Sequence, residues 1–422
     1  MLMKKYRLFV TLLILIVLLF SIVYGEANSS SDKVYEKFQP FFQALQYILS
    51  DYYKKDVDVN SLVNDSIRGL VKGLGDPFSH YFDPQESIEM GIQTSAEYGG
   101  LGIEVTYTRN GFLKVISPMD DTPAFYAGIK PGDIIVTIDA SPVDQMTYLE
   151  AVNRLRGKKG TQVTIEILRE GNKQALKFII TRRIIKLKTV KYAIIPTEMG
   201  KIGYVRLTEF SEPTASDLAK ELSTLYAQDI KGLILDLRNN PGGLLSSAID
   251  VASDFISTGK VVVSVKDRGD YEDTYRSHGN SYPALPMVVL VNGGSASAAE
   301  IVSGALKDHH RATLIGEKTF GKGSVQSPIK LSNKGELWLT VAHYFTPSGE
   351  DIHGKGIMPD IVVHQSKEST QVATATANNL AIEEGRSLTS EKANIDLKRD
   401  IQLQKAIDIL KERINQTQKD AA

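Results

Sequence analysis

The sequence predicts a layered α/β domain with a small β-rich module inserted into it and helical segments at both ends. From Gly200 to about Val363, apolar strand-like runs alternate with amphipathic helical runs, which is typical of a layered α/β domain. From Tyr98 to about Arg183, short strand-like runs are separated by glycine-rich turns. Near both ends of the chain, apolar residues recur at helical spacing.

The composition excludes several classes of function. The 422 residues leave room for two or three domains, and the formal net charge of −1 gives no electrostatic case for binding nucleic acid or an acidic membrane. Cysteine is absent, which excludes disulfides, thiol catalysis, thiolate metal sites and a lipid-modified N-terminal cysteine. No His-Glu-x-x-His stretch occurs, so we expect neither a metal nor another cofactor.

Residues 1–25 are expected to be a targeting segment. A basic start, with Lys4, Lys5 and Arg7, precedes an apolar run of 16 residues at 8–23, whereas a spanning helix usually needs about 20. Two interpretations stay open: a signal peptide cleaved near Val23-Tyr24-Gly25, or a short membrane anchor. A polar stretch at 26–32 argues against a buried helix. The rest of the chain is therefore expected to be extracytoplasmic.

Residues 33–95 are expected to form a helical segment. Apolar residues recur at helical spacing from Tyr35 to Ile48, and a second helix covers about Val59 to Gly73. Residues 96–183 are expected to form the β-rich module. Its strands are expected at Leu101–Thr106, Phe112–Ile116, Asp133–Ile138, Val163–Leu168 and Leu176–Thr181, with one helix at about Thr147–Arg156.

Residues 184–365 are expected to form the α/β domain. Its expected strands are Ile202–Leu207, Gly232–Leu237, Lys260–Val265 and Met287–Val291, and its expected helices are Ala215–Tyr226, Leu244–Ile256 and Ser297–Lys307. Residues 366–422 begin with a low-complexity stretch and end in an amphipathic helix from about Leu397 to Ile414. The apolar stripes of this helix and of Lys33–Asp51 could join two chains in a homodimer, or pack on their own domain.

Two motifs carry chemistry. The first is the strand-to-helix turn Asn292-Gly293-Gly294-Ser295-Ala296-Ser297-Ala298. A serine at such a turn stands beside the free N–H groups and the positive end of a helix, which favours an oxyanion, although Ser295 or Ser297 could simply cap the helix. The second is Lys322, between Gly321 and Gly323. A desolvated lysine loses its proton easily and can act as a general base, but a mobile surface loop would have the same sequence.

Together with Asp236-Leu237-Arg238-Asn239-Asn240-Pro241-Gly242-Gly243, these motifs resemble the C-terminal processing (tail-specific) peptidases. The resemblance covers about residues 35–365. It implies an α/β protease core, an inserted PDZ-like domain that binds protein tails, and a serine endopeptidase that works through a Ser/Lys dyad. By motif, Ser297 matches the nucleophile, Lys322 the general base and Gln326 the amide that positions the lysine. The oxyanion hole would use the backbone N–H groups of Ala298 and of Gly243, which we favour over Gly242.

Geometry adds one condition to this assignment. In an extended strand, Lys322 and Gln326 would lie about 13 Å apart, so their contact requires a local turn, which we expect at Gly323. Two alternatives stay open. A Ser–His–Asp hydrolase could use His343 or His353, although no Gly-x-Ser-x-Gly elbow occurs. A PDZ adaptor with a decayed core could bind without cleaving, although Ser297, Lys322 and Gln326 are all present.

The stretch Gly99-Gly100-Leu101-Gly102 is the expected binding site for a substrate tail. Small residues can aim several N–H groups at one carboxylate, and the strand that follows can take up a peptide by β-augmentation. The expected partners are therefore proteins or peptides with free, apolar C-termini. Arg156 ends the helix beside this site. It could be a solvated helix terminus, or a contact through which the bound tail regulates the core, since the following Gly157 permits close approach.

Overall fold

The computed structural model describes residues 34–365 and 400–420, apart from residues 35, 109, 120, 173, 270, 280 and 281. The chain divides into two compact units, residues 1–70 and 71–422. In the first unit, residues 36–51 are helical, and α2 (Val59–Lys72) begins there, so both expected helices are confirmed. The targeting segment at 1–25 lies outside the described residues. Within the described ranges, no helix is long and apolar enough to cross a membrane.

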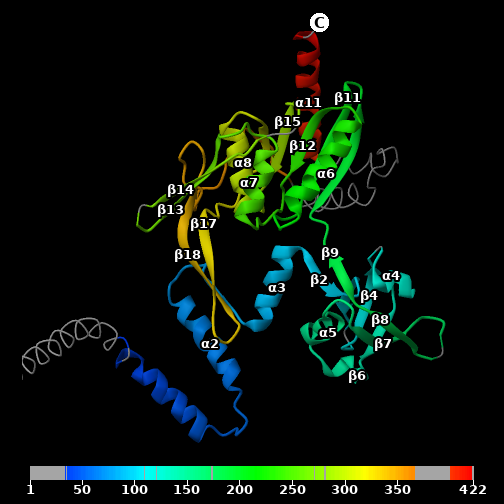
Figure 1. Ribbon diagram of the computed structural model, residues 1–422, viewed down its shortest axis with the longest axis vertical. Helices are drawn as coiled ribbons and strands as arrows, with labels where there is room; N and C mark the ends of the chain where they lie inside the picture. The colour runs from blue at the N-terminus through cyan, green and yellow to red at the C-terminus, as the bar shows by residue number, and fades with distance from the viewer. Residues whose placement is uncertain are drawn as a thin grey trace, which may run out of the picture. The chain divides into compact units, whose positions relative to one another are not determined.

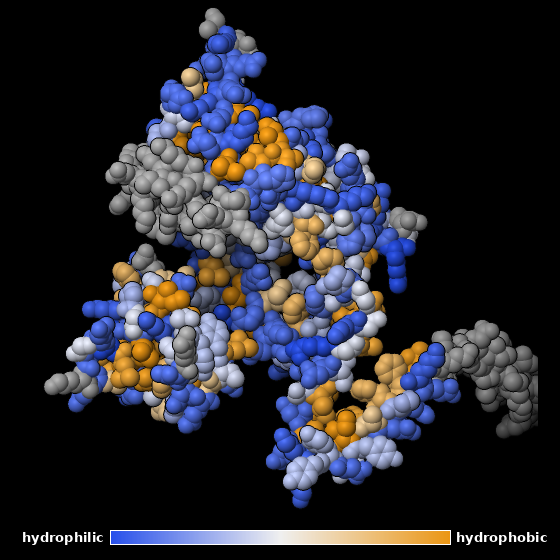
Figure 2. Space-filling view, turned by 180° about the vertical axis from the view of Figure 1, so that it is seen from behind, coloured by the Kyte–Doolittle hydropathy of each residue, from blue (hydrophilic) through white to orange (hydrophobic). Residues whose placement is uncertain are grey.

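The first unit exposes apolar side chains along its helices, where orange groups gather in Figure 2. The exposed fractions of Phe41 and Phe42 are 43% and 55%. Other exposed members of this surface are Phe38, Tyr47, Ile48 and Leu49. A surface of this kind suits the pairing of two chains, and the homodimer stays a prediction.

The centre of the second unit is a six-stranded sheet in the order β10-β11-β12-β15-β16-β19 (Figure 1). β10 is antiparallel to β11, and the other neighbours are parallel. The strands are β10 (Val190–Thr197), β11 (Gly200–Leu207), β12 (Ile230–Asp236), β15 (Met287–Val291), β16 (Thr313–Gly316) and β19 (Ile361–Val362). Parallel neighbours need crossover connections. Helices lie in the connections between β11 and β16, whereas the connection from β16 to β19 contains two further strands. The α/β fold class is thereby confirmed.

Helices cover both faces of this sheet. Alternate residues of β12 point to opposite faces, so Leu233 and Leu235 join one apolar core and Ile234 the other. The first core holds α6 (Thr214–Ala227), α7 (Leu245–Ser253) and α8 (Ala298–Asp308). The second core holds α11 (Ile401–Asp420), which starts and ends later than expected and buries Leu403, Leu410 and Ile414. The stripe of this helix therefore packs on its own domain.

A second sheet extends from the core in the order β1-β18-β13-β14, and β17 also pairs with β18. Its strands are β1 (His80–Phe82), β13 (Val261–Asp267), β14 (Glu272–Arg276), β17 (Ser324–Lys330) and β18 (Glu336–Phe345). Only β13 was expected from the sequence. Pro328 and several polar residues interrupt β17, so it lacks the apolar alternation that identifies a strand.

The inserted module has a sheet in the order β3-β4-β5-β7-β8, with the short β6 (Ser141–Pro142) beside β5. The strands β3 (Ile103–Tyr107), β4 (Leu113–Pro118), β5 (Ile134–Ile138), β7 (Gln162–Leu168) and β8 (Leu176–Thr181) confirm the five expected ones. They enclose an apolar core with α4 (Pro123–Ala127) and α5 (Tyr148–Leu155). The chain enters through β2 (Glu97–Gly100) and leaves through β9 (Arg183–Lys186), and these two strands pair with each other.

Candidate active site

Two loops meet where neighbouring strands of the central sheet end. Residues 237–243 follow β12, and residues 292–297 follow β15 and lead into α8. Four hydrogen bonds join the loops: Asn239 N–H to Asn292 Oδ1 (2.9 Å), Asn292 Nδ2 to Asn239 Oδ1 (2.9 Å), Ala296 N–H to Asn240 O (2.9 Å) and Ser295 Oγ to Leu237 O (2.7 Å). The carboxyl ends of parallel strands are the usual place for a site in such a sheet.

The two candidate serines have different surroundings. Ser295 is fully buried, and its hydroxyl donates to Leu237 and accepts from the N–H of Asn292 at 3.0 Å. Ser297 is 8% exposed and immediately precedes α8, with φ 53° and ψ −116°. A non-glycine residue in this region is strained by about 1–3 kcal/mol, and such strain collects at functional sites. The geometry therefore assigns a structural role to Ser295 and supports Ser297 as the nucleophile.

Two backbone N–H groups near Ser297 have no hydrogen-bond acceptor among the described residues, namely those of Ala298 and Gly243. The N–H of Gly242 is already used, since it donates to Asn240 Oδ1 at 2.9 Å. Gly242 has a left-handed backbone (φ 101°), and a Cβ atom there would lie 2.7 Å from the Cβ of Ser297. This arrangement supports Gly243 and Ala298 as the oxyanion donors.

Glu300, fully buried on α8, connects the nucleophile to the lysine loop. Its Oε2 accepts from the backbone N–H of Ser297 (2.9 Å) and of Lys322 (2.8 Å). Its Oε1 accepts from the N–H of Gly321 (2.7 Å) and from the Thr319 hydroxyl. A buried carboxylate needs such donors, and these charge-assisted hydrogen bonds are strong. Glu300 was not predicted from the sequence, although Ser-x-x-Glu at a helix start is a capping-box signature.

Lys322 is half-buried, and burial lowers the pKa of its ammonium below the ordinary value. Its Nζ lies 5.6 Å from the centre of the Phe78 ring. No hydrogen bond joins Lys322 to Ser297 within the described part of the chain. In structures without substrate, catalytic hydrogen bonds are often long. The missing hydrogen bond therefore does not exclude the expected dyad, which stays a proposal.

Among the described residues, no hydrogen bond joins Gln326 to Lys322. Its Nε2 donates to Ser324 Oγ at 2.9 Å and to Thr340 Oγ1 at 3.3 Å. The ladder between β17 and β18 has an irregularity next to Gln326, and Gly321 rather than the expected Gly323 has a left-handed backbone (φ 92°). No hydrogen bond in this structure therefore supports the expected role of Gln326 in positioning Lys322.

The rival histidines lie beside the lysine loop. The rings of His343 and His353 are 4.5 Å apart, and His343 Nδ1 lies 3.4 Å from Asp351 Oδ2. The backbone of His353 packs closely on Gly323. For the residues that the structure describes, no hydrogen bond connects either histidine to Ser297. The same bond is missing for Lys322, so the Ser–His–Asp triad stays the alternative that mutation has to test.

A buried ion-pair network fixes the start of the 237–243 loop. Arg238 pairs with Asp236 at 2.6 Å and with Asp400 at 2.9 Å, and all three side chains are at most 3% exposed. Asp236 also accepts from the Tyr204 hydroxyl at 2.7 Å. Burial opposes the charge of Asp236, but Arg238 outweighs this effect and lowers the pKa of the carboxyl. Asp400 immediately precedes α11, so the network attaches the C-terminal helix to the loop that carries Gly243.

The inserted module has a groove of about 220 Å³ between β3 and α5. Its lining is mainly apolar: Tyr98, Leu101, Ile103, Val105, Tyr148, Val152 and Leu155, with Gly102, Glu104 and Arg156. β3 is an edge strand, and the N–H groups of Leu101 and Gly102 have no acceptor among the described residues. Of the four expected tail-binding residues, Leu101 and Gly102 thus face the groove. Gly99 and Gly100 belong to β2, where the Gly99 carbonyl accepts from Gly157.

Arg156 reaches from the groove to a helix outside the inserted module. It follows α5 and forms an ion pair with Glu89 of α3 (Pro84–Ser95). Its guanidinium also lies 5.1 Å from the centre of the Tyr98 ring. The backbone of Gly157 approaches Gly99 closely. Arg156 is therefore a half-buried bridge and not a solvated helix end.

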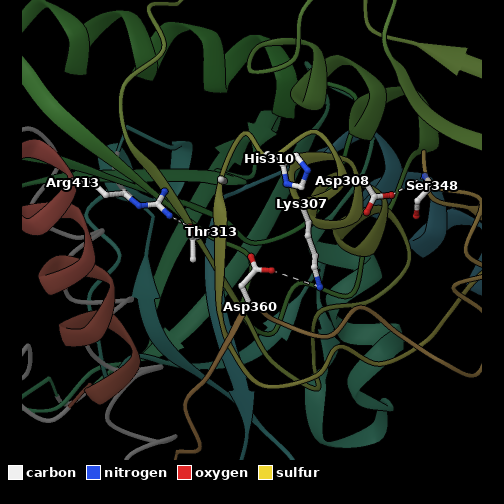
Figure 3. Close-up of a pocket in the computed structure, with 8 residues that line it drawn as sticks. Lys307, Asp308, His310, Thr313, Ser348, Asp360 and Arg413 are labelled. Carbon is white, nitrogen blue, oxygen red and sulfur yellow. Dashed lines mark hydrogen bonds and ion pairs between the residues drawn. The ribbon is translucent and has the colours of Figure 1, made fainter. Parts of the chain in front are cut away.

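A separate cavity of about 500 Å³ lies at the other end of α8 (Figure 3). Its lining groups pair with their neighbours: Lys307 with Asp360 at 3.7 Å, Asp308 with the N–H of Ser348 at 2.8 Å, and Arg413 with Thr313. About 16 Å of helix separates it from Ser297, so it is not part of the candidate active site.

Comparison with known proteins gives three family matches. The model described as "Peptidase family S41" matches residues 201–363, that of the "PDZ domain" residues 99–180, and that of the "Activating protease CtpB N-terminal domain" residues 21–86. The carboxy-terminal-processing protease of Bartonella bacilliformis is 43% identical over 343 residues, which are 80% of this chain and 77% of that protein.

The carboxy-terminal processing protease CtpA of Bacillus subtilis is 38% identical over 343 residues, 81% of this chain and 72% of that protein. Among solved structures, the photosystem II D1 C-terminal processing protease is 32% identical with a TM-score of 0.45, and the match covers 77% of this chain and 87% of that one.

Proposed function

Because this chain belongs to the carboxy-terminal processing proteases of peptidase family S41, and is a serine peptidase with a PDZ domain, we propose that it is exported, captures the C-terminal tail of a protein substrate and cleaves near it through an acyl-enzyme on Ser297. The observation that carries this proposal is the strained Ser297 beside the two free N–H groups of Ala298 and Gly243. Residues 1–25 would direct export, and residues 8–23 could serve as an anchor.

In the proposed reaction, the neutral amine of Lys322 takes the proton of Ser297 as the oxygen attacks the scissile carbonyl. The N–H groups of Ala298 and Gly243 stabilise the oxyanion of the tetrahedral intermediate. Collapse breaks the C–N bond, and the Lys322 ammonium returns its proton to the leaving amine. Water then hydrolyses the ester on Ser297 with Lys322 again as the base.

The groove in the inserted module supports capture of an apolar tail. Its free N–H groups at Leu101 and Gly102 suit a terminal carboxylate, and the free edge of β3 suits an extended peptide. We expect a peptide that ends in a carboxamide to be cleaved with a kcat/KM about tenfold or more below that of the same peptide with a free carboxylate, because charge-assisted hydrogen bonds are lost. Steady-state kinetics on the matched peptides measures this. Equal rates would exclude carboxylate capture.

We also propose that the module gates the core through Arg156. This residue lines the groove and pairs with Glu89 outside the module, so a bound tail can change both contacts at once.

Arg156→Ala is expected to lower kcat by about tenfold while KM changes less. Arg154→Ala is the matched control, since this exposed arginine of α5 donates its side-chain hydrogen bond to Ser141, inside the module. A rise in KM with unchanged kcat would mean that Arg156 only helps to hold the tail.

A further inference from the structure

A segment that precedes the PDZ domain in the chain forms part of the surroundings of the candidate general base. β1 pairs antiparallel with β18, and His80 lies opposite Trp338 in the register. One residue earlier, the Ser79 hydroxyl accepts a hydrogen bond from the N–H of Thr340 at 3.0 Å. Residues 76–82 are therefore fixed to the hairpin whose first strand, β17, begins two residues after Lys322.

The turn Asp76-Pro77-Phe78-Ser79 determines where the Phe78 ring lies. The carboxylate of Asp76 accepts from the Phe78 N–H at 3.0 Å and from the Ser79 hydroxyl at 2.6 Å. Burial of this carboxyl favours its neutral form, but the hydrogen bonds from Ser79, Thr340 and Phe78 outweigh it and lower the pKa of Asp76 to about 2. The turn is thus held by an ionised side chain at any pH at which the enzyme would be assayed.

The Phe78 ring lies between two parts of the active-site surroundings. Its centre is 5.6 Å from the Nζ of Lys322. The same ring makes an edge-to-face contact with His353, with 5.6 Å between ring centres, and the His353 ring is in tilted contact with that of His343. Phe78 is only half-buried, so its position is not explained by packing in the apolar cores of the protein.

We propose that Phe78 is a positioning residue for Lys322, whose ring covers the lysine side chain and keeps water from it. The inference rests on the proposed role of Lys322 as general base. Phe78 lies outside the segment 201–363 that matches the peptidase family, and this proposal gives it a role in the catalytic reaction. The segment before the PDZ domain then belongs to the active site and is more than a connection.

Two physical effects of the ring oppose each other. Exclusion of water disfavours the ammonium and lowers the pKa of Lys322, whereas the negative face of the ring attracts a cation and raises it. Burial lowers the pKa of Lys322, and we expect exclusion of water by the ring to be the larger of the two effects. The charged or titratable groups around the loop are Glu300 of α8, Asp76 of the turn, His343 of β18, and Asp351 and His353 after it.

The test is the pH profile of kcat/KM for a peptide with a free, apolar C-terminus, measured on the full-length chain. For Phe78→Ala we expect the rising limb to move up by about one pH unit, so that kcat/KM at pH 7 falls about tenfold while the plateau at high pH changes by less than about threefold. Phe78→Leu keeps the cover and removes the attraction for the cation, so its midpoint is expected to stay or to fall slightly. Phe125→Ala, on the exposed face of α4, is the control and should match the wild type.

Phe78→Gln serves if the alanine variant does not fold, because a polar side chain of similar length admits water and should move the limb in the same direction. If the midpoint of the pH profile is unchanged in both Phe78→Ala and Phe78→Gln, the inference is overturned, even if the plateau of kcat/KM changes. Lys322→Ala separates this failure from a failure of the dyad. If the rising limb persists without Lys322, the base is another group, and both the dyad and the role of Phe78 are wrong.

Discussion

Ser297→Ala is expected to lower kcat by about 10⁴-fold or more, because it removes the oxygen that attacks the substrate. Binding of a tail peptide to the PDZ domain should be unchanged, since the groove between β3 and α5 contains no part of the 292–297 loop. Folding should not suffer either, since Ser297 carries backbone strain that alanine would share. Peptide cleavage followed by mass spectrometry measures the first effect, and calorimetric titration of the peptide measures the second.

Ser295→Ala is the matched control for this experiment. It deletes a buried hydroxyl that bonds to Leu237 and Asn292, so we expect a loss of about 1–3 kcal/mol in the free energy of unfolding and a folded enzyme that still cleaves. If the two variants lost activity equally while both stayed folded, Ser297 could not be singled out as the nucleophile.

Lys322→Ala is expected to abolish cleavage to a similar extent, and Lys322→Arg should not restore it, because a guanidinium stays protonated and cannot act as a base. In the wild type, burial lowers the pKa of Lys322. The reactive form is the neutral amine, so kcat/KM should rise with pH through this lowered pKa. A rate governed by a group that titrates like histidine, and lost in a His343 or His353 variant, would favour the rival triad.

The same pKa shift provides a control for folding. Below the folded pKa of Lys322, the native state holds an ammonium that burial disfavours, and the unfolded chain binds its proton more tightly. Lys322→Met removes this cost. The unfolding temperature of this variant at pH 7 should equal or exceed that of the wild type, so its loss of activity cannot be ascribed to unfolding.

Much of the fold could be predicted because local patterns and tertiary packing agree. The apolar run of β15 followed by small residues and α8 predicted both elements, and Met287–Val291 was found with the expected bounds. The strands of the inserted module followed from short apolar runs between glycines. β17 was not predicted, because Pro328 and polar residues break its apolar alternation and its place is fixed by pairing with β18. β18 was missed, although its β-branched and aromatic residues favour a strand.

The site could be predicted only where a motif is contiguous. Ser297 and Lys322 stand in recognisable short motifs, and Glu300 had a local signal at the third position after Ser297. Phe78 had none, because its contact with Lys322 joins residues 244 positions apart (322 − 78). The link from Asp400 to Arg238 likewise depends on how α11 packs across the sheet. Charged pairs this far apart in the sequence cannot be predicted from periodicity or from the spacing of motifs.

The most direct test of the account is to label the full-length protein with a serine-reactive fluorophosphonate and to map the modified residue by mass spectrometry. The account predicts a single modification on Ser297, absent from Ser297→Ala, retained in Ser295→Ala and formed much more slowly in Lys322→Ala. Modification of another residue, or labelling that persists unchanged in Ser297→Ala, would contradict the assignment of Ser297 as the activated nucleophile.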